Sequence, residues 1–589
     1  PQAADDMETE PARYPPGGYP GSGAGGGVPP LGGAGGEAGA ASEAAAGGRG
    51  SRKVARGVSF VEGPETDGRG APVDRDARKG HGGGRPAASA ASLEASLAPL
   101  AQDAQQLIAE ALAEIQGACH AVAPTGEQLL TVGACHLGVL QADDEVDVVF
   151  PAPPEAPLEQ VAERVQLQLG ECAGVALVSP LGPDGLLQAP GLRIAMLSRV
   201  VVKLIFSQRI PNLPDPRPEV IVQRVAGIYA REISENILAS VPNQGQFRAL
   251  LQFVRRWARL RGVYGQGSFM GFLGGTAWAI CCARACQTNS HLELPQLVGR
   301  FFRAVSRWDW KQPVSLSAPA SPTAAAQSGP PPPAYDALAA PGDAASGGGG
   351  GKVLTLVLLP VGQNMSATPF ATDTILKITQ KELRRGYKMT QQVELGRVPW
   401  NDMYAKARFF QRHRHYLEFD FMARSPEILE PWLAWGRQHM QNLVKLFEER
   451  SASMATLRPW PEEVEFKDAE WPCARAVFVG LHLERSGGAG LDGAARRSFD
   501  LREPIVKLLE AVSGWSQAEA NHGQFELLIR HVRLAELEQW LELQREGRVR
   551  PGSEKLGPLQ LPAPGELEGE ASGELGAEAD DGQFRHASL

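Results

Sequence analysis

The sequence predicts an α+β protein made of several domains, and three observations support this. Its 589 residues exceed what one hydrophobic core usually covers. Short β-like apolar runs and helical patterns alternate in two separate parts of the chain, with a mainly helical stretch between them. The 67 Gly and 46 Pro, too many for one globular protein, are concentrated in a few stretches that have little apolar periodicity. The folded parts are therefore expected to be flanked and interrupted by low-complexity segments.

The low-complexity stretches fall at both ends and at one internal position. They bury too little apolar surface to offset chain entropy, so we expect them to be disordered. The first contains the basic run RGSRKVARG, which is either a nuclear-localisation or RNA-contact patch or a solvated charge cluster. The predicted divisions are a Gly/Ala/Pro-rich tail (1–88), a mixed-sheet domain with an N-terminal helix (89–213), a helical domain (214–313), a linker with PPPP and SGGGGG (314–351), a second α+β domain (352–545) and an acidic disordered tail (546–589).

The first folded part reads as a small mixed sheet backed by helices. Leucines and alanines at helical spacing predict a helix over about 92–122. A second helical pattern, APLEQVAERVQLQLGE, separates two of the β-like runs, as expected for a sheet with crossover connections. The predicted strands are LLTVGACHLGVL (129–140), VDVVF (146–150), VALVS (175–179) and RVVVKLIF (199–206).

The later parts read first as helical and then as α+β. GQFRALLQFVRRWARLRGVY carries an apolar stripe at i, i+3, i+4 and i+7, and TAWAICCARACQ is a second apolar helix. Beyond the linker we expect a strand (VLTLVLLPV), a helix capped by Thr or Asp (FATDTILKITQKELRRGYKM), a strand (RHYLEFDFMAR), a helix (EPWLAWGRQHMQNLVKLFEER) and a strand (ARAVFVGLHLE). This order is typical of an RRM-like domain. No aromatic signature such as GFGFV is present, so the motif alone does not predict RNA binding there.

Charge and cysteine content limit the class of protein. The net charge of −9 argues against a nucleic-acid binder overall, but the acidic tail GELEGEASGELGAEADD shifts this average, so any basic surface is local. The basic segments ELRRGYK, FFQRHRH and IRHVR either contact phosphate or form solvated faces. Seven cysteines without a C-x-x-C pair favour reduced thiols in the cytosol or nucleus over zinc or disulfides. No signal peptide or membrane-spanning run is expected.

The segment VGACHLGVLQADDEVDVVF carries the chemistry that the sequence offers. Residues i and i+2 of a strand project from one face, so Glu145 and Asp147 are expected to share a pair of divalent ions. Two such ions, Mg²⁺ or Mn²⁺, activate an attacking hydroxyl and stabilise a leaving pyrophosphate. A turn at Gly133 would bring backbone amides close to a triphosphate. By itself, this pattern is also that of a solvated acidic cluster at the start of a strand.

Several motifs follow one another along the chain: GACHLGV, EVD, ALLQFVRRWARLRGVY, GFLGGTAWAICCARACQ, VGRFFRAVSRWDWKQPVSL, FFQRHRHYLEFDF and WGRQHMQNLVKLFEE. In their order and nearly in their spacing they resemble the eukaryotic nuclear-type poly(A) polymerases. The resemblance covers roughly 92–312 and 352–485. It implies a nucleotidyltransferase-type mixed-sheet domain, a helical central domain and an RNA-binding C-terminal domain. It also implies ATP as substrate, an RNA 3′ end and cleavage and polyadenylation factors as partners, and a nuclear location.

The same resemblance assigns the site residues. Glu145 and Asp147 take metal-ligand positions. Arg255 stands where the family has a lysine that contacts the triphosphate, and Tyr264 where it has a tyrosine beside the nucleotide. From the sequence alone, Tyr264 and Trp257 also fit core packing. The remaining nucleotide-binding positions are the turn residues Val132, Gly133 and Ala134 and the adenine-side residues Gly275 and Thr276.

The sequence departs from the family pattern at four places. Ala134 replaces a serine of the turn, and Glu145 replaces an aspartate. Tyr264 and the Gly274-Gly275 pair are about two residues farther apart than in the family, so Gln266 aligns only loosely with a nucleotide-binding asparagine. The largest change is Lys203, which stands where the third metal carboxylate is expected. An ammonium beside a dication is repelled where a carboxylate would be attracted, by about 4 kcal/mol for charges 4 Å apart at an effective dielectric near 20. Alternatively, Lys203 pairs with Glu145 and Asp147 so that a salt bridge replaces the metal, or it donates to phosphates, which puts Lys203 and Asp147 among the nucleotide-binding candidates.

Three functions follow from these residues. The first is addition of AMP from ATP to RNA 3′ ends, weakened by Lys203. The second is a catalytically inactive pseudo-polymerase that binds RNA or protein in an RNA 3′-processing complex. The third is a nucleotidyltransferase with another nucleotide preference, because Lys203 and Arg255 change the charge around the triphosphate. Metal-dependent adenylation is expected to be weak or absent.

Overall fold

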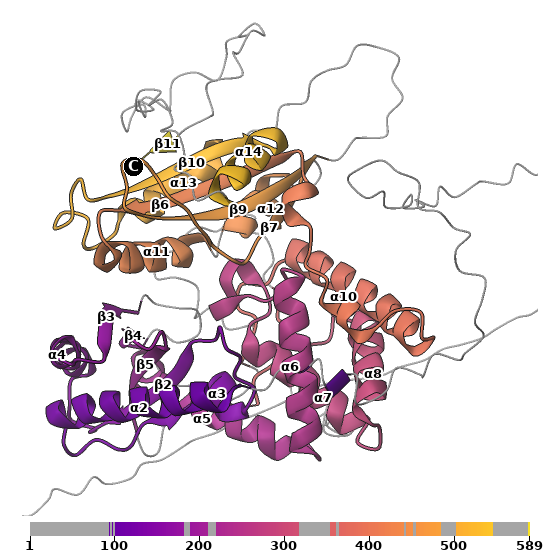
Figure 1. Cartoon of the computed structure of the whole chain (residues 1–589), viewed down its shortest axis with the longest axis horizontal. Helices are drawn as coiled ribbons and strands as arrows, with labels where there is room; N and C mark the ends of the chain where they lie inside the picture. The colour runs from indigo at the N-terminus through magenta and orange to yellow at the C-terminus, as the bar shows by residue number, and fades with distance from the viewer. Residues whose placement is uncertain are drawn as a thin grey trace, which may run out of the picture. The chain divides into compact units, whose positions relative to one another are not determined.

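The computed structural model describes residues 93–94, 97, 100–181, 189–209, 219–316, 354–360, 365–440, 443–451, 455–483, 502–545 and 587–588 (Figure 1). The predicted tail 1–88, nearly all of the linker 314–351 and most of the tail 546–589 lie outside these residues. The predicted domain boundaries stay predictions. All seven cysteines are described, and each is a free thiol.

The first folded part is a five-stranded mixed sheet in the order β1-β2-β5-β4-β3. Strands β2 and β5 run parallel, and the other neighbours are antiparallel. On β2, Val148 and Phe150 pack in the core shared with α2 and α4, whereas Val149 faces α5. Asp147 therefore lies on the α5 side. The elements are α2 (Gln102–Val122), β1 (Leu130–Thr131), α3 (Gly133–Leu137), β2 (Val146–Ala152), α4 (Leu158–Gly170), β3 (Val175–Pro180), β4 (Gly191–Met196) and β5 (Val201–Gln208).

Two sequence expectations for this sheet need correction. The run 129–140 is not one strand: it forms the two-residue β1 and then α3, because Gly133 adopts φ +53° and turns the backbone into a helix. Strand β4 was not predicted, since GLRIAM is short and mixes arginine with apolar residues. The predicted runs around β2, β3 and β5 are confirmed.

The helical part packs around aromatic residues. Trp257 of α6 is 1% exposed, and its ring lies 6.0 Å from Trp278 and 4.8 Å from Phe302 in edge-to-face geometry. Core packing is thus the observed role of Trp257. Helix α6 begins at Asn243, whose side chain accepts a hydrogen bond from the Gln246 N–H at 3.1 Å. The elements are α5 (Glu219–Ser240), α6 (Gln244–Leu260), η1 (Gln266–Gly271), α7 (Gly275–Thr288), α8 (Leu294–Ser306) and α10 (Asp373–Glu394).

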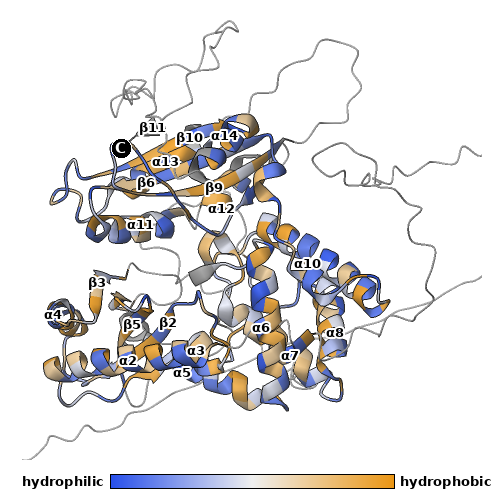
Figure 2. Cartoon of the chain, viewed as in Figure 1, coloured by the Kyte–Doolittle hydropathy of each residue, from blue (hydrophilic) through white to orange (hydrophobic). Residues whose placement is uncertain are grey.

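The segment Phe269–Thr288 is long and apolar enough to pass a length-and-hydropathy test for a membrane span. However, 83% of its most apolar window is buried inside the protein, where α7 packs between α6 and α8. Figure 2 shows the apolar residues of this part of the chain gathered in its interior and hydrophilic residues along α10. The segment has the character of a core helix.

Helix α10 packs against α8, although the sequence assigned it to the C-terminal α+β domain. A Cβ at Gly386 would lie 2.5 Å from the Phe302 ring, so glycine permits this close approach. Thr372 caps the helix and accepts a hydrogen bond from the Ile375 N–H at 3.5 Å, as predicted. The predicted strand VLTLVLLPV is wrong: its described residues form only isolated bridges, Val314 with Val357 and Leu358 with Ser366.

The C-terminal sheet has the order β11-β10-β6-β9-β7, with β8 paired to β9. The chain order β6, α11, β7, β9, α13, β10 together with this pairing is the ferredoxin-like connectivity. The predicted single helix around 430–450 is divided into α11 and α12. The elements are η3 (Trp400–Tyr404), η4 (Phe409–Gln411), β6 (His415–Ala423), α11 (Pro426–Met440), α12 (Leu443–Ser451), β7 (Ala455–Pro459), β8 (Val464–Glu465), β9 (Cys473–Leu483), α13 (Arg502–Ser513), β10 (Phe525–Arg533), α14 (Leu534–Arg545) and β11 (Ala587–Ser588).

Both faces of this sheet are covered. On one face Phe421 packs with Trp432 of α11, and on the other Phe478 packs with Trp540 of α14. An RRM binds RNA by stacking bases on aromatic residues of an open sheet face. Here α14 covers that aromatic face, so binding of RNA by an RRM-like domain stays a prediction.

His413 gives the C-terminal part a measurable pH dependence. Burial, together with the nearby Arg458, lowers the pKa of His413 to about 4. The unfolded chain takes up this proton near pH 6.5 but the native state only near pH 4, so stability is lost as pH falls through this window. As pH falls, the free energy of unfolding of the parent is expected to decrease by up to about 3 kcal/mol because of His413. The decrease in the His413→Gln variant is expected to be smaller. The check is urea unfolding between pH 7 and 4.

Replacement of the exposed His291 by Gln is the matched control and is expected to leave the pH dependence unchanged. An equal pH slope in the parent and the His413→Gln variant would contradict the prediction.

Candidate functional site

Strand pairing places the predicted catalytic residues side by side. Asp147 on β2 is in register with Lys203 on β5, and Lys203 is in register with Arg193 on β4. Glu145, just before β2, reaches the same spot, because its carboxylate contacts both Lys203 and Arg193. The prediction that Lys203 lies beside the two acids therefore agrees with the geometry. Arg193 was not predicted.

Both oxygens of Glu145 are held by cations. Lys203 Nζ lies 2.8 Å from Glu145 Oε2, and Arg193 Nε donates to Oε1 at 2.9 Å. Burial raises the pKa of Glu145, but Lys203 and then Arg193 outweigh it and lower this pKa to about 2. Glu145 is therefore a carboxylate at neutral pH, and its charge is already neutralised by side chains of the protein.

Asp147 has a different environment. Its half-buried side chain faces the Gly133 turn, and a Cβ on Gly133 would lie 3.3 Å from Asp147 Oδ2. Burial raises the pKa of Asp147 to about 6 and Glu145 adds to the rise, although Lys203 opposes it. Near pH 6 a large fraction of this side chain is therefore protonated.

The residues present do not fit a pair of divalent ions. Hard cations need several oxygen ligands with free lone pairs. Glu145 gives both oxygens to ion pairs, and Lys203 brings an ammonium where a third carboxylate was needed. Among the described residues, no group of three or more His, Cys, Asp or Glu side chains could hold a metal ion. The arrangement is that of an ion-pair cluster.

The predicted phosphate-binding turn adjoins Asp147. The Val132 N–H donates to the Asp147 carbonyl at 3.0 Å, and the Gly133 N–H donates to Ser234 Oγ of α5 at 3.3 Å. Ala134 packs at the edge of the core and brings no hydroxyl. The turn is thus fixed between β2 and α5, and its contact with a phosphate stays a prediction.

A second group of predicted residues surrounds Asp144. Arg255 is 3% exposed and donates to Asp144 Oδ2 at 2.9 Å and to the Val139 carbonyl. Arg259 also pairs with Asp144. The guanidinium of Arg255 is therefore engaged inside the protein, and its predicted contact with a triphosphate has no support in this geometry. Asp144 and Arg259 were not singled out from the sequence, since QADDEVD does not reveal which acid turns inward.

Tyr264 lies beside the start of α7. A Cβ at Gly275 would come within 2.8 Å of the Tyr264 hydroxyl, so these two predicted residues adjoin. The Arg259 guanidinium lies over the Tyr264 ring, 4.9 Å from its centroid. Thr276 follows Gly275 in the first turn of α7, whereas the side chain of Gln266 lies outside the described residues. The adenine-side role of these residues stays a prediction.

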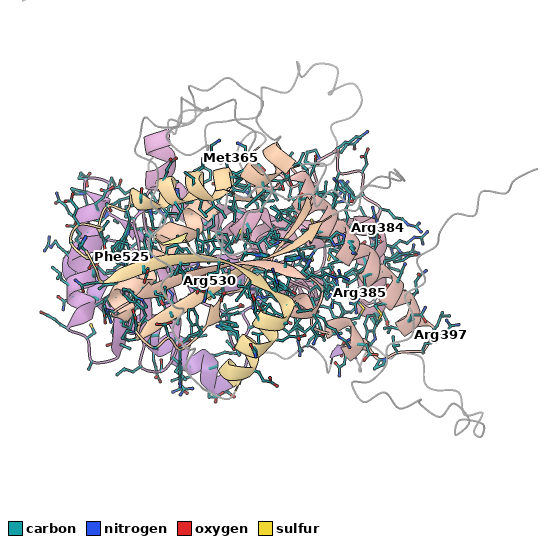
Figure 3. All side chains as sticks on the ribbon, turned by 90° about the horizontal axis from the view of Figure 1, so that it is seen from above. Met365, Arg384, Arg385, Arg397, Phe525 and Arg530 are labelled. Atoms are coloured by element: carbon teal, nitrogen blue, oxygen red, sulfur yellow. The ribbon has the colours of Figure 1, made fainter. Side chains whose placement is uncertain are left out.

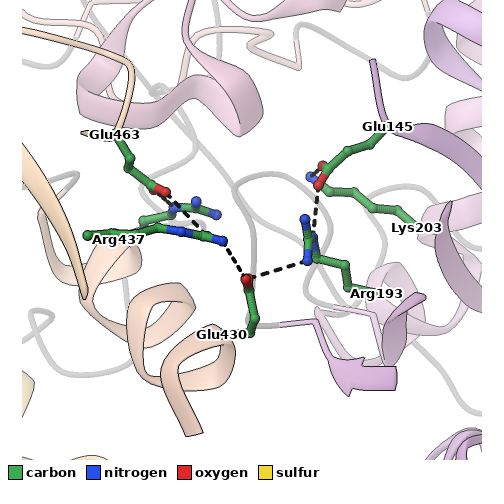
Figure 4. A network of polar contacts seen from close by, with 7 residues as sticks. Glu145, Arg193, Lys203, Glu430, Arg437 and Glu463 are labelled. Atoms are coloured by element: carbon green, nitrogen blue, oxygen red, sulfur yellow. Dashed lines mark hydrogen bonds and ion pairs between the residues drawn. The ribbon is translucent and has the colours of Figure 1, made fainter. Parts of the chain in front are cut away.

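The ion pairs at Glu145 continue into the C-terminal part. Arg193 Nη1 lies 3.5 Å from Glu430 Oε2 of α11, and Arg475 Nη2 of β9 lies 2.8 Å from Glu430 Oε1. Figure 4 shows this alternation of charges. We call it the ion-pair chain; its members are Lys203, Glu145, Arg193, Glu430, Arg475, Glu463 and Arg437.

The members of the ion-pair chain other than Glu463 line a pocket that also includes Ser179 and Pro180 of β3. Sequence reasoning missed its C-terminal members. The sequence pattern gave only a weak indication of these residues. Arginines and glutamates on amphipathic α11 and on β9 are as common on a solvent-exposed face as in an ion-pair site.

The fold and the site together combine a mixed sheet that has two acids at the start of a strand, a glycine turn beside them, and an adjoining helical part. Residues 246–406 match the family model of the poly(A) polymerase central domain. These residues include α6, α7, α8 and α10.

Curated relatives agree with this match. The chain is 26% identical to Nuclear poly(A) polymerase 1 of Arabidopsis thaliana over 399 residues, covering 66% of this chain and 52% of that protein. It is 24% identical to poly(A) polymerase pla1 of Schizosaccharomyces pombe, covering 55% of each chain. The chain is therefore similar to eukaryotic poly(A) polymerases, and residues 246–406 carry the match to their central domain. It spans about half the length of the curated relatives it matches.

Solved structures give weaker similarity. A crystal structure of mtPAP in complex with UTP is 12% identical with a TM-score of 0.39, covering 54% of this chain and 71% of that chain. A Cid1 structure described by its RNA terminal uridylyl transferase activity is 9% identical with a TM-score of 0.37, covering 52% of this chain and 94% of that chain.

Proposed function

We propose that this protein acts at RNA 3′ ends as a poly(A) polymerase-like nucleotidyltransferase with ATP as its nucleotide. Relatives named nuclear poly(A) polymerase support this proposal and a nuclear location. Asp147 adjoins the glycine turn, and Tyr264 beside Gly275 supplies a candidate nucleotide position. Partners among cleavage and polyadenylation factors belong to the same proposal.

We further propose that transfer of AMP by this protein is weak. The observation that carries this proposal is the Lys203–Glu145 ion pair of 2.8 Å, completed by Arg193. These contacts neutralise one of the two acids. Lys203 also offers no base for the RNA 3′ hydroxyl, because an ammonium has no free lone pair.

The direct test is primer extension of oligo(A) by the full chain with ATP and Mg²⁺ or Mn²⁺. We expect a rate of extension far below that of an ordinary polymerase. Enzymes typically have kcat values of about 1–10³ per second. Extension at an ordinary rate would contradict the proposal that transfer of AMP is weak. If UTP or CTP is incorporated in preference to ATP, the nucleotide substrate is not ATP, and that part of the proposal is wrong.

Nucleotide binding can be tested separately through thermal stability. A ligand present at a hundred times its dissociation constant stabilises a protein by about 2.7 kcal/mol. We expect ATP to stabilise the parent and to stabilise Gly275→Ala less, because the added Cβ would lie 2.8 Å from the Tyr264 hydroxyl. Gly117→Ala, where a Cβ meets nothing within 4 Å, is the matched control. If ATP stabilises all three proteins equally, Gly275 is not part of the nucleotide site.

A second candidate is a pseudo-polymerase that binds RNA or protein in a 3′-processing complex without transferring AMP. The ion-pair chain favours it, since cations replace the expected metal at Glu145. RNA binding without extension, under every metal and nucleotide condition, would select this candidate over weak adenylation.

A further inference from the structure

The outward side of α10 carries an uninterrupted row of cations. Lys377, Lys381, Arg384 and Lys388 follow one another at spacings of four, three and four residues, and all four are exposed. At 100° per residue they fall within a narrow stripe opposite the buried side of the helix. The row is roughly 16 Å long at a rise of 1.5 Å per residue.

Helix α8 carries a second such row beside the first. Arg300, Arg303 and Arg307 are exposed and lie three and four residues apart. The two helices pack together, and the Arg307 guanidinium lies over the Tyr387 ring of α10, 5.4 Å from its centroid. We call these seven cations and Tyr387 the α8/α10 basic face. Figure 3 labels Arg384 and its neighbour Arg385 on α10.

The charges of this face have no carboxylate partner among the residues that the structure describes. No carboxylate of the described residues lies within ion-pair distance of any of the seven cations, whereas Arg255, Arg259 and Arg261 are all paired. The whole chain has a net charge of −9, so a face of seven cations runs against its average. Such a local excess of one sign attracts a polyanion.

We propose that the α8/α10 basic face binds single-stranded RNA through its phosphates. Cations spaced about 6 Å apart along α10 can follow a strand of successive phosphates, and no base is read at such contacts. The Arg307 guanidinium on Tyr387 adds a flat surface on which a base can stack. Because α14 covers the aromatic face of the C-terminal sheet, RNA binding requires another surface. This inference rests on the proposed function at RNA 3′ ends.

The test is direct binding of labelled oligo(A) to the full chain without nucleotide, over a range of salt concentrations. The variant is Lys381→Glu, Arg384→Glu and Lys388→Glu together. The control reverses three exposed cations elsewhere, Arg164→Glu, Lys406→Glu and Lys467→Glu, for the same change in net charge.

We expect the variant to bind at least tenfold more weakly at low salt. The slope of log affinity against log salt is expected to shrink by about 2, since each phosphate contact contributes about 0.7 for a single strand. The control is expected to stay close to the parent. None of the substituted residues lies in the proposed catalytic or nucleotide site, so primer extension is not the readout.

Two outcomes overturn the inference alone. One is equal affinity and equal salt slope in the variant and the parent. The other is an equal loss in the control, which would show a general effect of net charge. A third outcome, no RNA binding by the parent at all, overturns this inference and the proposed function together.

The chain's own acidic segment 565–581 is the competing occupant. If a peptide of this segment binds the parent but not the variant, and the variant keeps its RNA affinity, the face belongs to that segment and the inference fails. If deletion of 565–581 leaves the variant's loss of RNA affinity unchanged, RNA remains the occupant.

Discussion

Lys203→Asp is expected to give the protein Mn²⁺-dependent primer extension far above that of the parent. The change removes the ammonium 2.8 Å from Glu145 and places a third carboxylate in register with Asp147. At an effective dielectric near 20, one unit charge 4 Å from another is worth about 4 kcal/mol. A change of that size corresponds to roughly a thousandfold in rate or affinity.

Two measurements check this prediction. Primer extension with ATP reports the rate, and the thermal midpoint with and without Mn²⁺ reports ion binding. Without the ion the variant is expected to be less stable than the parent, because three acids then face one another beside Arg193 and the ammonium of Lys203 is gone. Mn²⁺ is expected to reverse this loss.

Lys203→Ala separates the two effects of the substitution, since it removes the cation and adds no carboxylate. It is expected to gain less than Lys203→Asp in both measurements. The exposed Lys467→Asp is the matched control for charge alone. If Lys203→Asp gains neither ion binding nor extension, the deficit extends beyond this position, and Ala134 and Arg193 are the next residues to change.

Glu382→Ala is expected to destabilise the folded protein by about 3–5 kcal/mol, the largest stability effect we predict. Glu382 of α10 is 2% exposed, and its Oε2 accepts from Arg261 Nε at 2.9 Å. Arg261 is also 2% exposed, and it donates to the Ala405 carbonyl at 2.7 Å. Removing the carboxylate leaves a buried guanidinium without its counter-charge. Urea unfolding at neutral pH measures the loss.

Glu394→Ala on the same helix is the control, because Glu394 is exposed and its removal is expected to change stability by less than about 0.5 kcal/mol. The double variant Glu382→Leu with Arg261→Met replaces both charges by apolar groups and is expected to recover much of the loss. A single Glu382→Ala variant as stable as the parent would contradict this prediction.

Local sequence patterns predicted much of the fold. Alternating or continuous apolar runs gave β2, β3, β5, β6 and β9, and the 3.6-residue stripe gave α6 and α10, because burial of one face is a local property of these segments. The apolar run VLTLVLLPV failed as a strand since it packs without regular strand partners. Helix α3 was missed because a positive φ at Gly133 redirects a run that reads as β.

The sequence by itself determined the resemblance to poly(A) polymerases and the replacement of an expected carboxylate by Lys203, because both are properties of residue identity in order. Only the tertiary structure decided what Lys203 contacts. Strand register set it beside Asp147 and Arg193, and α11 brought Glu430 against Arg193 from 237 positions later in the chain. Register and long-range packing depend on the energy of the whole assembled core, so no local pattern around Lys203 contains them.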